Sequence, residues 1–187
     1  RQGDVYEIIA GGDTFKTTVV INSAGVHADT IANLAGFSRY KIYPYRGEYY
    51  EVIDTKKDLI RSTLVYPALK PGSPVKGIHL TKTCEGRLLI GPNGKPWHQK
   101  QDDFTIQTPP DEFLRAAKKF LPELERNDIR WAFSGLRAKI NPGVGEEDFI
   151  IKREETNPIF INLIGIESPG LTAAFAIAEH VAKLIEE

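Results

Sequence analysis

The sequence predicts an α+β protein with an antiparallel or mixed sheet in its middle and pieces of an α/β domain at its two ends. Near each end, a continuously apolar strand runs into a glycine-containing turn and then a helix, first at 18–34 and again at 160–180. Between them, short strand-like stretches alternate with Pro and Gly turns, which is typical of an antiparallel meander. We therefore expect residues 1–40 and 141–187 to belong to one domain and residues 41–140 to a second, β-rich domain.

The N-terminal piece predicts a hairpin followed by a strand and a helix. Residues 5–17 contain two strand-like stretches around a pair of glycines. Residues 18–22 are more uniformly apolar, as expected of a buried central or parallel strand. A helix is expected from about 28 to 34, because Gly36 stands where a glycine commonly follows a helix.

The middle of the chain predicts a series of short strands, at 45–52, 62–66, 77–81, 87–90 and 103–106. An amphipathic helix is expected at 110–120, because its apolar residues recur at helical spacing. Further strands are expected at 129–136, 149–153 and 159–164.

The turn at 165–172 is the most informative feature of the chain. It follows an apolar strand and leads into an alanine-rich helix, in which Ala174, Ala178 and Ala182 repeat at helical spacing. Free N–H groups and the dipole at a helix start form an anion site from the backbone. The alternative interpretation is an ordinary strand-to-helix connection of an α/β domain.

Composition narrows the classes of function. The 24 Lys and Arg residues balance 25 Asp and Glu residues, with both signs mixed along the chain, which argues against nucleic acid as a partner. No apolar run reaches membrane-spanning length, and the polar N-terminus does not predict a signal peptide. Cys84 is the single cysteine, so we expect a reducing, cytoplasmic compartment, with peripheral membrane association left open. No cluster has metal-ligand spacing.

The chain begins with Arg1 and contains no methionine, from which we expect a piece of a longer protein.

Three segments together resemble the FAD-dependent oxidoreductases of the D-amino-acid oxidase superfamily. Residues 19–28 (VVINSAGVHA) are similar to the segment with which that family passes the flavin, and residues 133–137 (FSGLR) are similar to its A-G-L-R-P segment. The turn and helix from residue 165 are the third.

Within the superfamily, the L-2-hydroxyglutarate dehydrogenases and oxidases resemble this chain best. Residues 65–68 (VYPA), 77–81 (GIHLT) and 91–93 (GPN) are similar, in this order, to their Y-P-V-P, G-V-H-F-T and G-P-N segments, and residues 46–50 (RGEYY) match their R-G-E-Y-Y strand.

The family's N-terminal G-x-G-x-x-G unit, which holds the ADP pyrophosphate, has no counterpart here. The resemblance therefore implies FAD as the cofactor, bound together with a missing N-terminal FAD-binding segment. Residues 1–40 and 141–187 would be parts of the FAD-binding domain, and residues 41–140 the substrate domain.

The resemblance also implies the site residues. Arg137 would hold the substrate carboxylate with its forked donors; a surface arginine at a strand end is the alternative. His79 would be a base for the hydroxyl proton, against the alternative of a half-exposed strand histidine. Tyr49, Tyr50 and Tyr66 are candidates for orienting the hydroxyl, and only one of Tyr49 and Tyr50 can face the site, because strand side chains alternate.

The residues near the flavin would be backbone-rich turn positions, namely Ala24, Gly25, Gly165, Ser168, Gly170, Leu171 and Thr172. Glu167 lies in the same turn, and we expect its side chain to point to solvent.

The implied function is oxidation of a small 2-hydroxy acid, similar to L-2-hydroxyglutarate, by hydride transfer to FAD. Glycerol-3-phosphate dehydrogenase-like and amino-acid oxidase-like activities are alternatives; the former needs further basic groups near Arg137, for which Lys139 is a candidate. A non-catalytic fragment that does not bind FAD alone is a third. The electron acceptor (oxygen, a quinone or another protein) stays open.

Overall fold

The computed structural model describes residues 3–68, 77–141, 148–156 and 158–186. Contacts divide the chain into two compact units. Among the described residues, the first unit holds those up to 44 and those from 137 on, and the second unit holds those from 45 to 136. Helices and strands mix in one α+β fold, as the sequence predicts.

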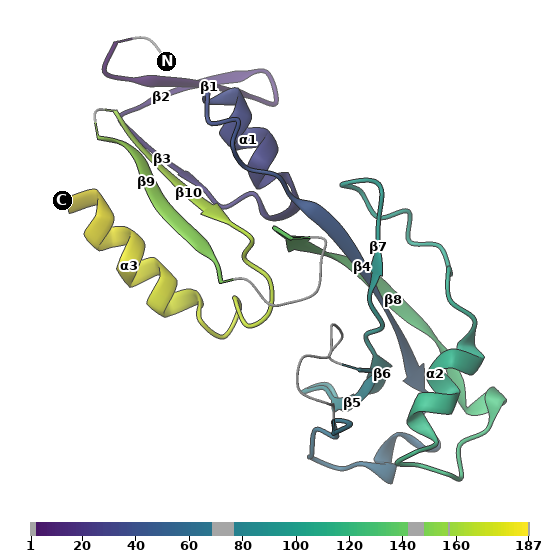
Figure 1. Cartoon of the computed structure of the whole chain (residues 1–187). Coiled ribbons are helices and arrows are strands. Elements are labelled where there is room, and N and C mark those ends of the chain that lie inside the picture. The colour runs from purple at the N-terminus through teal and green to yellow at the C-terminus, as the bar shows by residue number, and fades with distance from the viewer. Residues whose placement is uncertain (1–2, 69–76, 142–147, 157, 187) are drawn as a thin grey trace. The chain divides into compact units, whose positions relative to one another are not determined.

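The first unit is built on a three-stranded sheet of order β3-β10-β9 (Figure 1), with β3 at Val19–Asn22, β10 at Ile159–Ile164 and β9 at Ile150–Thr156. β3 runs parallel to β10, as expected, and β9 runs antiparallel to β10. β3 is the outer strand of this order and is only partly buried, with Ile21 43% exposed, so the expectation of a buried strand is wrong. Alternation sends successive β10 side chains to opposite faces of the sheet.

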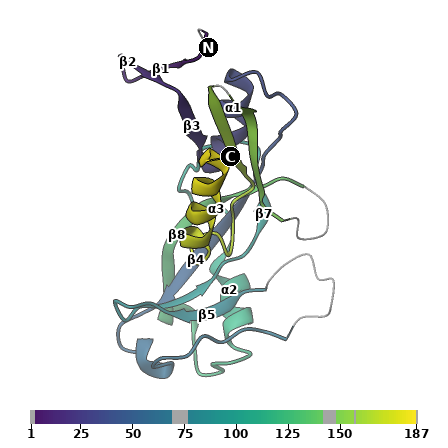
Figure 2. The ribbon, with the colours of Figure 1, turned by 90° about the vertical axis from the view of Figure 1, so that its left-hand side faces the viewer.

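One helix covers each face of this sheet (Figure 1 and Figure 2). Ile161 and Leu163 pack against Val181 of α3 (Ala174–Glu186). Ile164 packs on the other face against Ala28 of α1 (Ala28–Leu34). α1 has the expected bounds, and a short 3-10 turn, η1 (Gly25–His27), joins it to β3.

The N-terminal hairpin consists of β1 (Tyr6–Ala10) and β2 (Asp13–Thr17), paired antiparallel. It is anchored through Tyr6, which is buried and meets the ring of Phe160 edge-on at 5.4 Å between centroids.

The second unit contains a sheet of order β5-β6-β4-β7, with β8 also paired to β4. Its strands are β4 (Tyr43–Val52), β5 (His79–Lys82), β6 (Leu88–Gly91), β7 (Lys95–Pro96) and β8 (Ile129–Lys139). The pairs β4/β6, β4/β7 and β5/β6 are antiparallel, as the meander pattern predicts. The end of β8 from Arg137 on is grouped with the first unit.

The core of the second unit lies between this sheet and α2 (Pro110–Ala117). Phe113 of α2 is fully buried, and its ring packs against that of Tyr50 with 4.7 Å between ring centroids. Leu80 and Ile90 are buried in the same cluster. Short 3-10 turns lie at η2 (Lys57–Leu59) and η3 (Arg126–Asp128).

Two expected strands do not form. Within 62–66, Val65 makes only an isolated bridge with Leu80, and 103–106 forms no strand. The backbone oxygen of Thr105 instead accepts a hydrogen bond from the buried Arg46 side chain. A β-strand requires backbone hydrogen bonds to a neighbouring strand, so a stretch with strand-like composition but no such neighbour forms a loop.

Candidate functional site

Strand register places His79 and Tyr49 on the same face of the second unit's sheet. His79 pairs with Gly91, and Tyr50 pairs with Ile90, so Tyr49 falls opposite Gly91. Paired residues of antiparallel strands point to the same side. Tyr50 therefore faces the core, and Tyr49 faces the opposite side with His79.

Gly91 of β6 lies between these two residues in the sheet. Its φ of +140° is one that side-chain-bearing residues rarely adopt. A Cβ added there would lie 2.8 Å from the backbone oxygen of Glu48 and 2.9 Å from Cδ1 of Tyr49. The Tyr49 ring thus lies over a strand position that only glycine leaves clear.

His79 is half-buried and stacks on Tyr66, with 4.3 Å between ring centroids and 21° between planes. Its Nδ1 lies 3.2 Å from the backbone oxygen of Gly77. A carbonyl only accepts hydrogen bonds, so Nδ1 carries the proton and the lone pair of the neutral ring is at Nε2.

Tyr49 stacks in turn on Phe133, with 4.6 Å between ring centroids. Phe133 and Tyr66 are partly exposed, at 38% and 54%. We call Tyr66, His79, Tyr49 and Phe133 the aromatic face. Tyr50 is excluded from it, because its ring is buried in the core and its hydroxyl donates to the backbone oxygen of Thr108 at 3.1 Å.

A buried ion network, which the sequence did not lead us to expect, underlies the other face of β4. Nε of Arg46 donates to Asp102 at 2.7 Å, Nη2 donates to Ser134 at 2.9 Å, and Nη1 lies 3.1 Å from Glu48. Arg46 and Glu48 are each 2% exposed. The only sequence signal is the alternation of charges at 46 and 48 around a glycine.

The two carboxylates of this network stay ionised. Burial alone would raise the pKa of Glu48, but hydrogen bonds from Thr108, Gln107 and Asn93 outweigh it and hold that pKa below its ordinary value. Burial opposes ionisation of Asp102 in the same way, and hydrogen bonds from Arg46 and Ser134 lower its pKa. The network ties the loop around residues 102–108 to β4, the strand that carries Tyr49.

In the first unit, the predicted cofactor turns lie at one edge of the sheet. β3 and β10 are parallel, so the turns that follow their carboxyl ends meet at the same edge, where α/β sheets bind ligands. Asn22 and Asn162 lie side by side at this edge and are buried, with a 2.7 Å hydrogen bond from Asn22 Nδ2 to Asn162 Oδ1. Asn22 also accepts from the N–H of Ala24 at 3.3 Å.

Gly25 and Gly170 are brought together around one apolar pocket of about 520 Å³, which Ile21, Leu163, Ile177 and Ala178 also line. Gly25 has a φ of +56°. At Gly170 a Cβ would lie 2.7 Å from the backbone oxygen of Glu167, so the tight turn requires glycine there.

The other predicted cofactor residues lie outside the lining of this pocket. Gly165 is buried with a φ of +75°, and its missing Cβ leaves room for Ile140. Ser168 and Thr172 are exposed, and Leu171 is 93% exposed. Their assignment to the cofactor stays a prediction.

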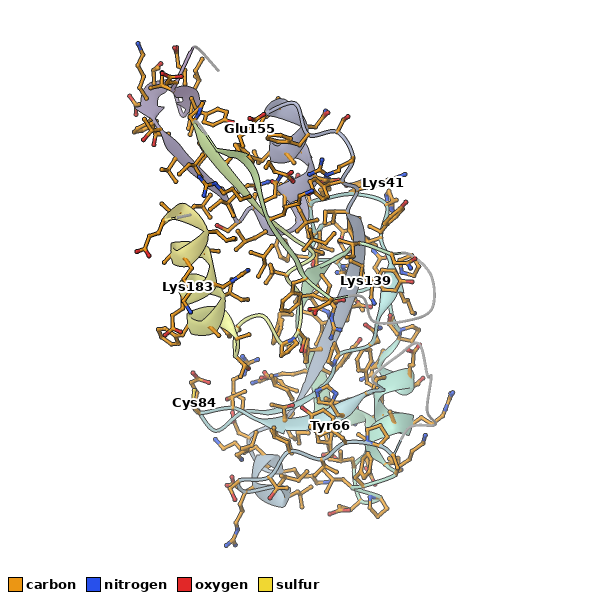
Figure 3. The ribbon with its side chains drawn as sticks, turned by 60° about the vertical axis from the view of Figure 1, so that its left-hand side comes forward. Lys41, Tyr66, Cys84, Lys139, Glu155 and Lys183 are labelled. Atoms are coloured by element: carbon orange, nitrogen blue, oxygen red, sulfur yellow. The ribbon has the colours of Figure 1, made fainter. Side chains whose placement is uncertain are left out.

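Arg137 lies beside Lys139 and Glu167 in the first unit. Nη1 of Arg137 is 3.9 Å from Oε2 of Glu167, and Nζ of Lys139 is 3.7 Å from Oε1. The side chain of Glu167 is 18% exposed. Our expectation that Glu167 points to solvent is therefore wrong, because the two cations at the end of β8 attract its carboxylate inward. Figure 3 labels Lys139.

His79 belongs to the second unit and Arg137 to the first. That they act in one site stays a prediction.

Cys84 lies exposed in the turn between β5 and β6 (Figure 3), as a turn residue should. A hydrogen bond to Glu85 raises the pKa of its thiol, which disfavours a nucleophilic role. Within the described ranges, no cluster of three or more His, Cys, Asp or Glu side chains could hold a metal ion. No helix in the part of the chain described above is long and apolar enough to cross a membrane.

Two curated relatives illustrate what the chain is similar to. It is 34% identical over 181 residues to a glycerol 3-phosphate dehydrogenase of Caloramator mitchellensis, covering 97% of this chain and 36% of the relative. It is 33% identical over 181 residues to the mitochondrial L-2-hydroxyglutarate dehydrogenase of Arabidopsis thaliana, covering 88% and 37%. The chain thus spans less than half the length of these relatives.

Solved structures of similar fold include two oxidases. L-α-glycerophosphate oxidase from Mycoplasma pneumoniae with FAD bound superposes with a TM-score of 0.74 at 26% identity, covering 95% of this chain and 45% of that one. Glycine oxidase from Geobacillus kaustophilus shares the fold, with a TM-score of 0.70 at 19% identity over 99% of this chain and 46% of its own. The family model described as FAD dependent oxidoreductase (DAO) matches residues 1–184. The chain therefore belongs to the DAO family of FAD-dependent oxidoreductases.

Proposed function

We propose that the protein carrying this chain oxidises the C–OH group of a small hydroxylated anion with FAD as the oxidant, and that a 2-hydroxy acid similar to L-2-hydroxyglutarate is its substrate. The observation that carries the proposal is the aromatic face. There the Nδ1–H of His79 is directed at a carbonyl, so the Nε2 lone pair suits a base for a hydroxyl proton. Membership of the family supports FAD.

The first unit fits the ring system of a flavin. Its apolar pocket lies between the sheet and α3, where Val181 and Ile185 help to line it, and it reaches Gly25 and Gly170 in the turns that follow two parallel strands. When bound, FAD supplies the chemistry of accepting a hydride from carbon.

The chain's own residues have separate tasks in this proposal. Arg137 holds the substrate carboxylate with parallel N–H donors and so fixes which hydrogen faces the cofactor. His79 takes the hydroxyl proton at Nε2. Tyr66, stacked on the imidazole, limits its rotation, and Tyr49, on the same face of the sheet as His79, orients the hydroxyl.

A glycerol 3-phosphate substrate is the second candidate, and one observation favours it. Lys139 and Arg137 both lie within 4 Å of the Glu167 carboxylate, so two cationic side chains are close together. A phosphate, with its two negative charges, needs more than one such cation. An amino-acid oxidase-like activity has no such observation in its favour.

The deciding experiment is anaerobic reduction of the bound flavin in the protein that carries this chain. We expect L-2-hydroxyglutarate to bleach the visible flavin absorbance faster than glycerol 3-phosphate or glycine at equal concentrations. Faster bleaching by glycerol 3-phosphate would select the second candidate. A protein that binds FAD but is reduced by none of the three would contradict the proposal. Reoxidation with oxygen or a quinone then identifies the acceptor.

A further inference from the structure

The geometry around Arg137 points to a specificity determinant. We propose that Glu167 sets the charge of the anion accepted by Arg137 and Lys139, and biases that site toward a singly charged carboxylate over a doubly charged phosphate. This inference rests on the proposed role of Arg137 in holding the substrate.

The charges in this cluster are unequal. Arg137 and Lys139 contribute two positive charges within 4 Å of one carboxylate, at 3.9 and 3.7 Å. The three side chains are 29%, 16% and 18% exposed, so solvent screens them only in part. Glu167 therefore offsets part of the positive charge of Arg137 and Lys139, which favours a monoanion over a dianion.

Glu167 is held in this place by the fold. Its backbone oxygen accepts a 2.5 Å hydrogen bond from the N–H of Gly170 in the turn before α3. Among the described residues, its Oε2 is buried and accepts no hydrogen bond, so the attraction of the cations is what offsets its desolvation. A carboxylate so placed adds a negative potential wherever Arg137 and Lys139 hold an anion.

Coulomb's law makes this effect depend on the charge of the ligand. Removing one negative charge improves the binding free energy of a dianion by twice as much as that of a monoanion at the same position. A residue that only maintains the local structure would instead change the affinity of both anions by the same factor. The ratio of the two affinities therefore isolates the electrostatic role.

The test uses acetate and sulfate as competitive inhibitors of the flavin-reducing substrate, and calorimetric titration of the same anions as a readout independent of turnover. For Glu167→Gln we expect the preference for sulfate over acetate to rise about three- to tenfold, from a charge removed at roughly 6–8 Å. Lys139→Met should shift the same ratio in the opposite direction.

Two variants serve as controls. Glu167→Asp keeps the charge and should leave the ratio near that of the wild type. Glu179→Gln removes the same charge from an exposed position on α3 and should leave it unchanged. An unchanged ratio in Glu167→Gln, with competitive binding intact in the wild type, overturns this inference alone. Failure of both anions to compete, together with an unaffected Arg137→Met variant, overturns the proposed role of Arg137 as well.

Discussion

Replacing Arg46 by methionine tests whether the buried ion network stabilises the second unit. The side chain of Arg46 is 2% exposed and is surrounded by Asp102, Glu48 and Ser134. Methionine approximates the length of the aliphatic stem but removes the charge and every donor. Two carboxylates then stay buried without their cation.

The expected loss follows from the burial of these partners. Removing one member of a buried, hydrogen-bonded ion pair costs about 3–5 kcal/mol, because it leaves an uncompensated charge in the interior. Arg126→Met is the matched control. Arg126 pairs with Asp111 at 3.7 Å, but the side chains are 56% and 72% exposed, and such surface pairs are worth about 0–1 kcal/mol.

The assay is denaturant unfolding at neutral and acidic pH. The pKa values of Glu48 and Asp102 are lowered in the folded protein, so their contribution to stability is present above their unfolded pKa values of about 4 and is lost as the pH falls through the folded values. In the Arg46→Met variant, burial instead favours their protonated forms. The difference in unfolding free energy between wild type and variant should therefore begin to narrow above about pH 4, where the buried carboxylates of the variant take up protons. It should narrow further below about pH 4, as the wild type loses the contribution of Glu48 and Asp102.

One result would refute this reasoning: an Arg46→Met protein as stable as the Arg126→Met control at pH 7. A large loss that does not depend on pH would also contradict it, since it would reflect packing and not the carboxylates.

Three further predictions follow from the site. Gly91→Ala should lower activity and stability together, because its Cβ would lie within 3 Å of the Glu48 backbone and the Tyr49 ring; unchanged kinetics and melting would show that this close approach is not needed. Arg137→Met should reduce kcat/KM for an L-2-hydroxy acid about a hundredfold or more, because a charge-assisted pair worth roughly 2–5 kcal/mol is lost, while flavin content should stay unchanged. Steady-state kinetics and a flavin spectrum test this, and loss of flavin would show that Arg137 binds the cofactor and not the substrate. The 187-residue chain alone should bind FAD weakly or not at all, and sub-micromolar affinity in a fluorescence titration would contradict this.

The sequence pattern was sufficient to predict elements that depend on local signals or that consist of a continuous apolar run. The helix at Ala28–Leu34 has its predicted bounds, because apolar spacing and Gly36 act within a few residues. The strand Ile159–Ile164 was also predicted to the residue, and β3 pairs with it in parallel as its uniform apolarity predicted. β10 is buried over most of its length, so its composition alone carries the signal, whereas β3 is partly exposed.

Only the tertiary structure decided which side chains meet. Arg46 and Asp102 lie 56 positions apart, and no local pattern links them. The choice between Tyr49 and Tyr50 depended on strand register, which follows from the pairing of β4 with β6. Glu167 turned inward because cations from a different strand lie beside it. Local periodicity determines which residues form an element, whereas long-range packing and charge determine what each element faces.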